Sequence, residues 1–243
     1  MLVLLPPSET KASGGDGSPL ALDRLSYSEL TPVRRKLIDE LVALAGDTPA
    51  GLAALKLSER QSAELERNAD LWTAPTLPAV QRYTGVLYAA LDASSLRPAQ
   101  RARLAVASAL FGLLAADDPI PAYRLSATSI LPGLGSMRSV WRPALDPLLA
   151  ELAGLVIDLR SGSYTALGAV PCAVTVDVVS DAGRGRRATV SHHNKSHKGR
   201  LARLLATAPQ ALSDAAGVAR IAQRGGLRAQ RTGEHALELI VEP

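Results

Sequence analysis

The chain contains 243 residues, of which 47% are hydrophobic and 3% aromatic, so a large core must be built from aliphatic side chains. No apolar run reaches the roughly 18 to 20 residues that a membrane-spanning helix needs, and residues 1–5 lack the features of a secretory signal. These features predict a cytoplasmic protein with no membrane partner. The single cysteine, Cys172, excludes an internal disulfide and a multi-cysteine zinc site.

The N-terminal part of the chain predicts one strand and two helices. Residues 2–5 predict a short buried strand that ends at two prolines. Thr31 and Pro32 are expected to cap and open an amphipathic helix. Residues 58–71 predict a second, polar helix that is capped by its first residue.

The rest of the chain mixes helices and strands. Helices are expected over residues 98–103, 139–153, 196–206 and 213–223. Strands are expected over residues 104–110, 154–159, 170–179, 188–192 and 236–241, the last as an edge strand. Because no regular strand–helix–strand repeat and no glycine-rich phosphate loop is present, we expect a single α+β domain over residues 1–243 rather than a doubly wound sheet.

Positive charge is concentrated near the C-terminus. The net charge of the whole chain is only +4, but between Arg184 and Arg231 eleven Lys or Arg residues accompany a single acid, Asp214. Such asymmetry is typical of a protein with a polyanionic partner.

Residues 191–205 allow three interpretations: a metal site, a phosphate-binding surface or an ordinary solvated helix. The three histidines there lie among four Lys or Arg residues, which disfavours a divalent metal, and we predict no metal site. Lys195 and Lys198 are three residues apart near a helix N-terminus, where free N–H groups also favour an anion. Gly199 is expected to let a ligand or another chain approach.

Two glycine-containing segments resemble nucleic-acid motifs. Residues 131–135 resemble the hairpin of helix-hairpin-helix modules, although the extended pattern of residues 123–130 favours an ordinary glycine turn. Residues 183–187 read as a hairpin tip, because they lack the interleaved aromatic residues of a nucleic-acid motif.

Short polar groupings lie where apolar segments end, which is where strand-end clefts collect reactive groups. They are residues 7–11, residues 83–85, Tyr123 with Arg124, and residues 161–164.

Taken together, these segments resemble the YaaA family, described as peroxide stress proteins. The resemblance is carried by residues 1–11, 83–85, 111–114, 123–125 and 157–161, with Asp118, Trp141, Tyr164, Ser191, Lys195, Lys198, Gly199 and Arg203. It implies a single mixed α/β domain of unusual topology with a basic cleft. It also implies DNA binding through a helix-hairpin-helix element, and a role in limiting oxidative damage to DNA and intracellular iron.

The first functional hypothesis is a cytoplasmic DNA-binding protein of the peroxide stress response. Binding would use phosphate contacts in a basic cleft, with little sequence preference. The residues assigned to anion or nucleic-acid binding are Lys11, Arg124, Lys195, Lys198, Arg200 and Arg203, joined by the basic residues of 184–187.

The second hypothesis is an enzyme that acts on a phosphorylated or nucleotide-like small anion and needs no further cofactor. Its candidate catalytic residues are Lys11, Tyr83, Arg124 and Tyr164. A neighbouring cation is expected to stabilise a tyrosine phenolate for acid–base work. A deep closed pocket that joins Lys11, Tyr83, Arg124 and Tyr164 would favour this hypothesis, and a broad open groove would favour DNA. A third interpretation is a structural protein whose polar groups only satisfy one another, so catalysis stays open.

Overall fold

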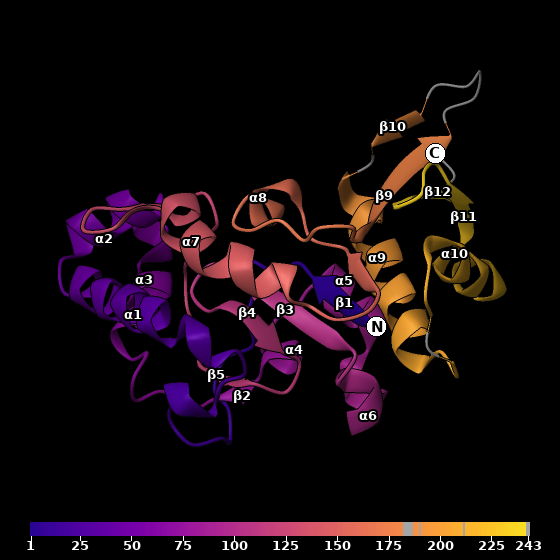
Figure 1. Ribbon diagram of the computed structural model, residues 1–243. Helices are drawn as coiled ribbons and strands as arrows, with labels where there is room; N and C mark the ends of the chain where they lie inside the picture. The colour runs from indigo at the N-terminus through magenta and orange to yellow at the C-terminus, as the bar shows by residue number, and fades with distance from the viewer. Residues whose placement is uncertain (182–186, 190, 211, 242–243) are drawn as a thin grey trace.

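A mixed β-sheet forms the centre of the molecule (Figure 1). The computed structural model describes residues 1–181, 187–189, 191–210 and 212–241, and for residues 181, 187–189 and 191–193 it describes the backbone alone. Within these residues the main sheet has the order β11-β12-β9-β8-β1-β3-β4, with β10 also paired to β9. Its strands are β1 (Leu2–Leu5), β3 (Leu104–Ser108), β4 (Gly112–Ala115), β8 (Val156–Asp158), β9 (Val174–Asp181), β10 (Arg187–Thr189), β11 (Arg228–Arg231) and β12 (Ala236–Val241).

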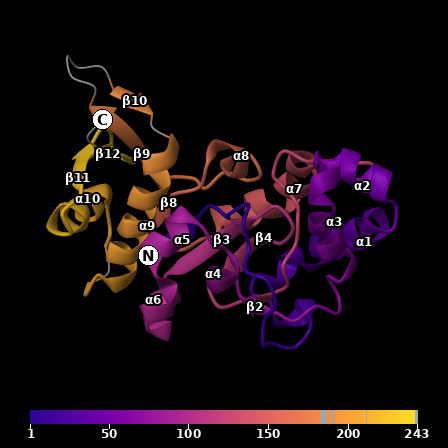
Figure 2. The same cartoon turned by 180° about the vertical axis from the view of Figure 1, so that it is seen from behind.

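Short strand pairs and helices surround this sheet. The two-stranded pairs are β2 (Leu77–Pro78) with β5 (Pro119–Ile120), and β6 (Ile130–Leu131) with β7 (Gly135–Ser136). The helices are α1 (Thr31–Ala45), α2 (Thr48–Leu55), α3 (Ser62–Ala69), α4 (Ala79–Arg82), α5 (Val86–Leu91), α6 (Pro98–Arg101), α7 (Met137–Ala150), α8 (Gly162–Thr165), α9 (Ser191–Thr207) and α10 (Ala215–Arg224). Figures 1 and 2 show α1, α2 and α3 gathered at one end, and α10 with β11 and β12 at the other.

Strand β1 lies inside the main sheet, where the order of the strands reverses. It pairs in parallel with β3 on one side and with β8 on the other. Val3, Leu4 and Leu5 are completely buried, as expected for an aliphatic strand with parallel neighbours on both sides. The chain passes first to β3 and later returns to place β8 on the opposite side of β1. Such a reversal opens a crevice at the carboxyl ends of the two strands, where open α/β sheets bind ligands.

The predicted fold class is confirmed: the chain forms a mixed α/β domain, and one cluster of buried apolar residues extends from β1 to β12. The strands expected over residues 2–5, 104–110, 154–159 and 170–179 correspond to β1, β3, β8 and β9. The helices expected over residues 98–103, 139–153, 196–206 and 213–223 correspond to α6, α7, α9 and α10.

Three local expectations are wrong. The strand expected over residues 188–192 ends at Thr189, because α9 already begins at Ser191. Strand β12 is not an edge strand, since it lies between β9 and β11. Its residues alternate between buried and half-buried, which indicates one buried face and not an open edge. Thr31 is the first helical residue of α1 and makes no side-chain cap, although Pro32 does lie in the first turn.

The glycine turn at residues 131–135 joins β6 to β7. Helix α7 follows it, but residues 123–129 before it contain no helix, so a helix-hairpin-helix element is not confirmed. The Gly133 N–H donates to Oε1 of Glu40 at 3.0 Å. This backbone N–H is therefore already bonded to a carboxylate of the same chain.

Helices α9 and α5 pack closely, and Gly199 is the reason. A Cβ atom at this position would collide with the carbonyl oxygen of Leu87 and lie only 2.9 Å from the Cβ of Ala90. The space expected beside Gly199 for a ligand is therefore filled by α5. This close approach also fixes the position of Tyr88 on α5 relative to α9.

We expect Gly199→Ala to lower the free energy of unfolding by about 1–3 kcal/mol, because an added methyl group must force the two helices apart. Chemical denaturation of the wild-type and variant proteins measures this loss. The matched control is Gly162→Ala, where an added Cβ meets nothing within 4 Å and stability should stay within about 0.5 kcal/mol of wild type. Equal stability of the two variants would contradict the packing argument.

Candidate functional site

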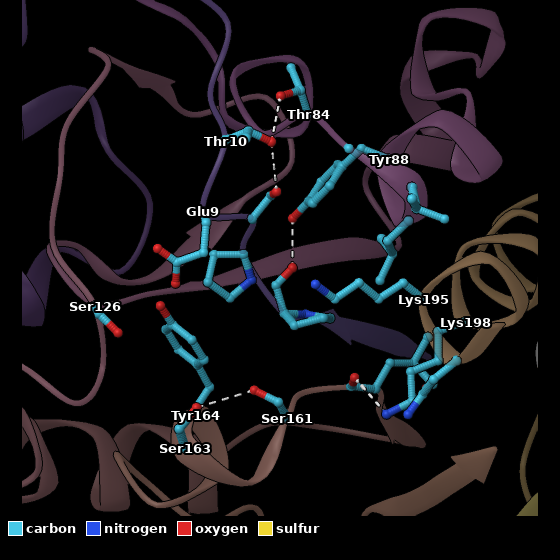
Figure 3. Close-up of a pocket in the computed structure, with 18 residues that line it drawn as sticks. Glu9, Thr10, Thr84, Tyr88, Ser126, Ser161, Ser163, Tyr164, Lys195 and Lys198 are labelled. Carbon is cyan, nitrogen blue, oxygen red and sulfur yellow. Dashed lines mark hydrogen bonds between the residues drawn. The ribbon is translucent and has the colours of Figure 1, made fainter. Parts of the chain in front are cut away.

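A cavity of about 620 Å³ lies where the chain leaves β1 and β8 (Figure 3). This volume is within the range of sites for small molecules. Four segments and one loop residue form its walls, and they come from distant parts of the sequence. The lining residues include Pro6–Thr10, Thr84–Tyr88, Ser126, Leu159 with Ser161, Ser163 and Tyr164, and Asn194 with Lys195 and Lys198. The crevice expected from the strand order is therefore present.

Backbone hydrogen bonds and one glycine shape the walls. The N–H of Leu159 donates to the carbonyl of Leu4 at 2.9 Å, so the chain after β8 stays tied to the end of β1. Gly85 has φ +98°, a conformation that favours glycine. A Cβ atom at residue 85 would lie 3.2 Å from Oγ of Ser8, so glycine allows the two walls to approach.

Hydroxyl groups line the same wall. Oγ1 of Thr84 donates to Oγ1 of Thr10 at 3.0 Å, and Oγ of Ser8 lies 3.2 Å from the same Thr10 atom (Figure 3). A chain of hydroxyls of this kind offers both donors and acceptors to a polar ligand.

Two buried tyrosines complete the walls. The hydroxyl of Tyr88 donates to the carbonyl of Pro6 at 2.8 Å. Burial raises the pKa of both Tyr88 and Tyr164, so both hydroxyls stay protonated near neutral pH. The expectation that neighbouring cations would stabilise a phenolate is wrong, because desolvation outweighs the favourable effect of Arg124 on Tyr164.

Lys195 and Lys198 enter the cavity from α9, the helix on which the sequence pattern placed them. Lys195 is exposed, and in Figure 3 it extends toward the side occupied by Glu9 and Tyr164. Lys198 is 9% exposed, and its amine donates to the carbonyl of Leu159 at 3.1 Å. Burial lowers the pKa of Lys198, and the charges of Asp177 and Asp158 only partly oppose this effect.

A buried ion pair stiffens the chain behind Lys198. Nε and Nη2 of Arg160 donate to the two carboxylate oxygens of Asp158 at 2.9 and 2.7 Å, and the Arg160 N–H donates to the same carboxylate. The two side chains are only 2% and 6% exposed. This bidentate pair fixes the turn that presents the Leu159 carbonyl to Lys198.

Asn194 lines the cavity, but its amide oxygen is not exposed to it. The Oδ1 atom is buried and has no hydrogen-bond partner among the described residues. A buried polar atom without a partner costs free energy. Asn194 lies one helical turn before Lys198, so both side chains point to the same side of α9.

Lys11 and Tyr83 form a second cluster beside the cavity wall. The Lys11 amine donates to the carbonyl of Ser8 at 3.2 Å and lies 4.3 Å from the ring centroid of Tyr123. The hydroxyls of Tyr83 and Tyr123 are 2.7 Å apart, and Tyr123 also bonds to Ser108 at 2.8 Å. Burial lowers the pKa of Lys11 to about 8 and raises the pKa of Tyr83 to about 12.

Arg124 lies next to this cluster but already has a partner. Its Nη1 atom lies 2.6 Å from Oε2 of Glu9 in an ion pair. Its backbone is fixed by reciprocal hydrogen bonds with the buried side chain of Asn68. Arg124 therefore positions Glu9 at the cavity wall.

The remaining predicted cations lie elsewhere. Nη1 of Arg203 donates to the carbonyls of Leu91 and Asp92 at the end of α5, and lies 3.3 Å from the Asp92 carboxylate. Arg200 is exposed on α9. The side chains expected at residues 184–187, His192 and His193 lie outside the described residues.

The structure thus brings together only part of the predicted site. Lys195, Lys198 and Tyr164 line one cavity, and Lys11 with Arg124 flank its Glu9 wall. A single basic cleft that joins all six predicted cations is not confirmed. Sequence reasoning missed Tyr88 and Asn194. The four-residue spacing between Asn194 and Lys198 was the available signal.

We expect the low pKa of Lys11 to make folding stability depend on pH. Between pH 8 and 10 the unfolded chain, with a lysine pKa of 10.5, binds more protons than the folded one, so the free energy of unfolding rises with pH. Relative to Lys11→Met, the wild type should gain on the order of 1–2 kcal/mol over this window. Above pH 10 the raised pKa of Tyr83 acts in the opposite direction.

Denaturation at a series of pH values measures this dependence. The control Lys36→Met removes an exposed lysine of α1 and should leave the slope unchanged. Parallel curves for wild type and Lys11→Met would show that Lys11 titrates normally.

Comparison with known proteins gives the family. A family model described as "Peroxide stress protein YaaA" matches residues 1–228. A UPF0246 protein of Corynebacterium efficiens is 51% identical over 231 residues, covering 93% of this chain and 94% of the relative. UPF0246 proteins of Corynebacterium glutamicum (46% identity, 99% of this chain and 100% of the relative) and Streptomyces coelicolor (45%, 85% and 84%) are also similar. None of the described helices could span a bilayer. The chain belongs to the peroxide stress protein YaaA family, also named UPF0246.

Proposed function

We propose that this protein of the peroxide stress family binds a phosphorylated small molecule in the cavity between the ends of β1 and β8. The observation that carries the proposal is the pair of lysines, Lys195 and Lys198, that enter one small cavity from the same helix. Charge-assisted contacts between lysine and phosphate are among the stronger polar interactions. The hydroxyls of Ser8, Ser161 and Ser163 supply further partners for a polyhydroxylated ligand.

A partly open cavity of this size supports a small molecule better than a duplex. The cavity walls come from strand ends and helix starts, and its volume of about 620 Å³ suits a nucleotide or sugar phosphate. Protonated Tyr164 would serve as a proton donor in such a site. These features favour the enzyme hypothesis, although Tyr164 alone among its four candidate catalytic residues lines the cavity.

Titration with glycerol 3-phosphate and AMP tests this proposal. We expect Lys195→Ala to weaken binding by about tenfold or more, because it removes a charge-assisted contact, and Lys198→Ala to weaken binding less, because the buried Lys198 amine carries a positive charge less readily. Isothermal titration calorimetry measures the affinities, and Lys36→Ala on α1 is the matched control. If neither phosphate binds the wild-type protein, or if all variants bind equally, the cavity is not a phosphate site.

DNA binding is the second candidate function. Helix α9 contains no acidic residue and exposes Lys195 and Arg200, and Arg220, Arg224 and Arg231 are exposed on α10 and β11. Exposed cations of this kind contact phosphates without reading sequence. Lys198 would contribute little to a duplex contact, since its side chain is buried.

For DNA binding, the double variant Lys195→Ala, Arg200→Ala should flatten the slope of log affinity against log salt by roughly two units. Lys198→Ala should leave the slope unchanged. Fluorescence anisotropy with duplex, single-stranded and branched DNA at several salt concentrations measures both slopes. An unaltered slope for the double variant would remove α9 from any DNA interface.

A further inference from the structure

Lys198 differs from the other lysine of the cavity in its surroundings. Its side chain is 9% exposed, whereas Lys195 one turn earlier is exposed. Its amine donates to a neutral acceptor, the carbonyl of Leu159, rather than to a carboxylate. The Asp158 carboxylate nearby is already engaged by both guanidinium nitrogens of Arg160. The charges of Asp177 and Asp158 act on Lys198, but its amine donates its hydrogen bond to a backbone carbonyl.

An amine in this setting is suited to act as a nucleophile. Only the neutral form attacks a carbonyl carbon, and desolvation or a neighbouring cation increases the neutral fraction of a lysine. Burial lowers the pKa of Lys198, and the charges of Asp177 and Asp158 oppose this effect only in part. Neutral Lys198 still has an N–H for the Leu159 carbonyl, so losing a proton leaves no backbone acceptor without a donor.

Other groups that line the cavity with Lys198 are candidates to assist the reaction. Tyr164 lines the cavity as a protonated hydroxyl and is the candidate proton donor for a departing hydroxide, since the hydroxyl proton of Tyr88 is already donated to the carbonyl of Pro6. Lys195 at the exposed side would hold a phosphate group away from the reacting carbon.

We propose that Lys198 forms an imine with a phosphorylated aldehyde or ketone that binds in this cavity. The inference rests on the proposed function, because the phosphate must first bind there. It goes further by naming the reacting group of the protein and the chemical class of the substrate.

The step balances without an oxidant or reductant. The neutral Lys198 nitrogen forms a bond to the carbonyl carbon while the π electrons of the carbonyl move to oxygen, and a proton passes from nitrogen to that oxygen. The carbinolamine then loses water: the C–O bond breaks as a tyrosine donates a proton, the nitrogen lone pair forms the C=N bond, and the remaining N–H proton returns to the tyrosinate when the imine is neutral.

Reductive trapping tests the proposal. The full-length protein is incubated with glyceraldehyde 3-phosphate and sodium cyanoborohydride, which delivers hydride to the imine and makes the adduct permanent. Intact mass should increase by the mass of the ligand less one oxygen atom, and peptide mass spectrometry should place the adduct on Lys198. Glycerol 3-phosphate, which has the phosphate but no carbonyl, should compete and form no adduct. Labelling should accelerate as pH rises, with a midpoint below the ordinary lysine value of 10.5.

Variants separate imine formation from folding and binding. Lys198→Arg keeps a cation in the cavity, so it should still bind glycerol 3-phosphate but lose at least about tenfold in labelling. Lys36→Ala, an exposed lysine of α1, should label like wild type. Thermal melts check that each variant is folded.

Each outcome has a distinct meaning. An adduct on Lys195, on Lys11 or spread over surface lysines would overturn the assignment to Lys198. Binding of glycerol 3-phosphate without any adduct would overturn the imine and leave the phosphate site intact. If neither glyceraldehyde 3-phosphate nor glycerol 3-phosphate binds, the proposed function is overturned, and the imine with it.

Discussion

Strand β1 has parallel partners on both of its edges, and the rest of the site depends on this pairing. Its backbone hydrogen bonds to β3 and β8 continue through Leu159, whose N–H still pairs with Leu4 after β8 has ended. The chain after β1 leads toward β3, and the chain after β8 leads toward β9 in the opposite direction along the strand order. The two segments therefore diverge. The cavity lies between these two segments. Its walls are irregular segments of the chain, which the hydrogen-bonded strands hold in position.

Helix α9 supplies the two lysines of the cavity, and its packing against α5 decides how deeply each lysine is buried. Gly199 lets the helix approach α5 closely, which carries Lys198 down against the Leu159 carbonyl while Lys195, three residues earlier, stays exposed. Two lysines of the same helix are therefore chemically different. The exposed one keeps its solvation and suits an anion, whereas the buried one is desolvated and suits chemistry that needs a neutral amine.

The other predicted cations show why charge in a sequence does not locate a site. Arg124 is neutralised by Glu9, Arg203 is bonded to carbonyls at the end of α5, and Lys11 lies over the ring of Tyr123. Each has a structural partner that the sequence does not reveal. Family membership supports a role in peroxide stress, while the geometry of the cavity supports binding and chemistry on a small phosphorylated molecule.

Local patterns in the sequence determined the main elements, the mixed fold class and the lysine pair of α9, because helical period and β-branched runs depend on neighbouring residues alone. They also marked Tyr164 and residues 7–11 as polar groups at strand ends. Only the tertiary structure decided the internal position of β12, the role of Gly199 and the inclusion of Tyr88 and Asn194. Those features depend on contacts between residues that are distant in the chain, and the burial that shifts the pKa of Tyr88, Tyr164 and Lys198 arises only when such contacts form.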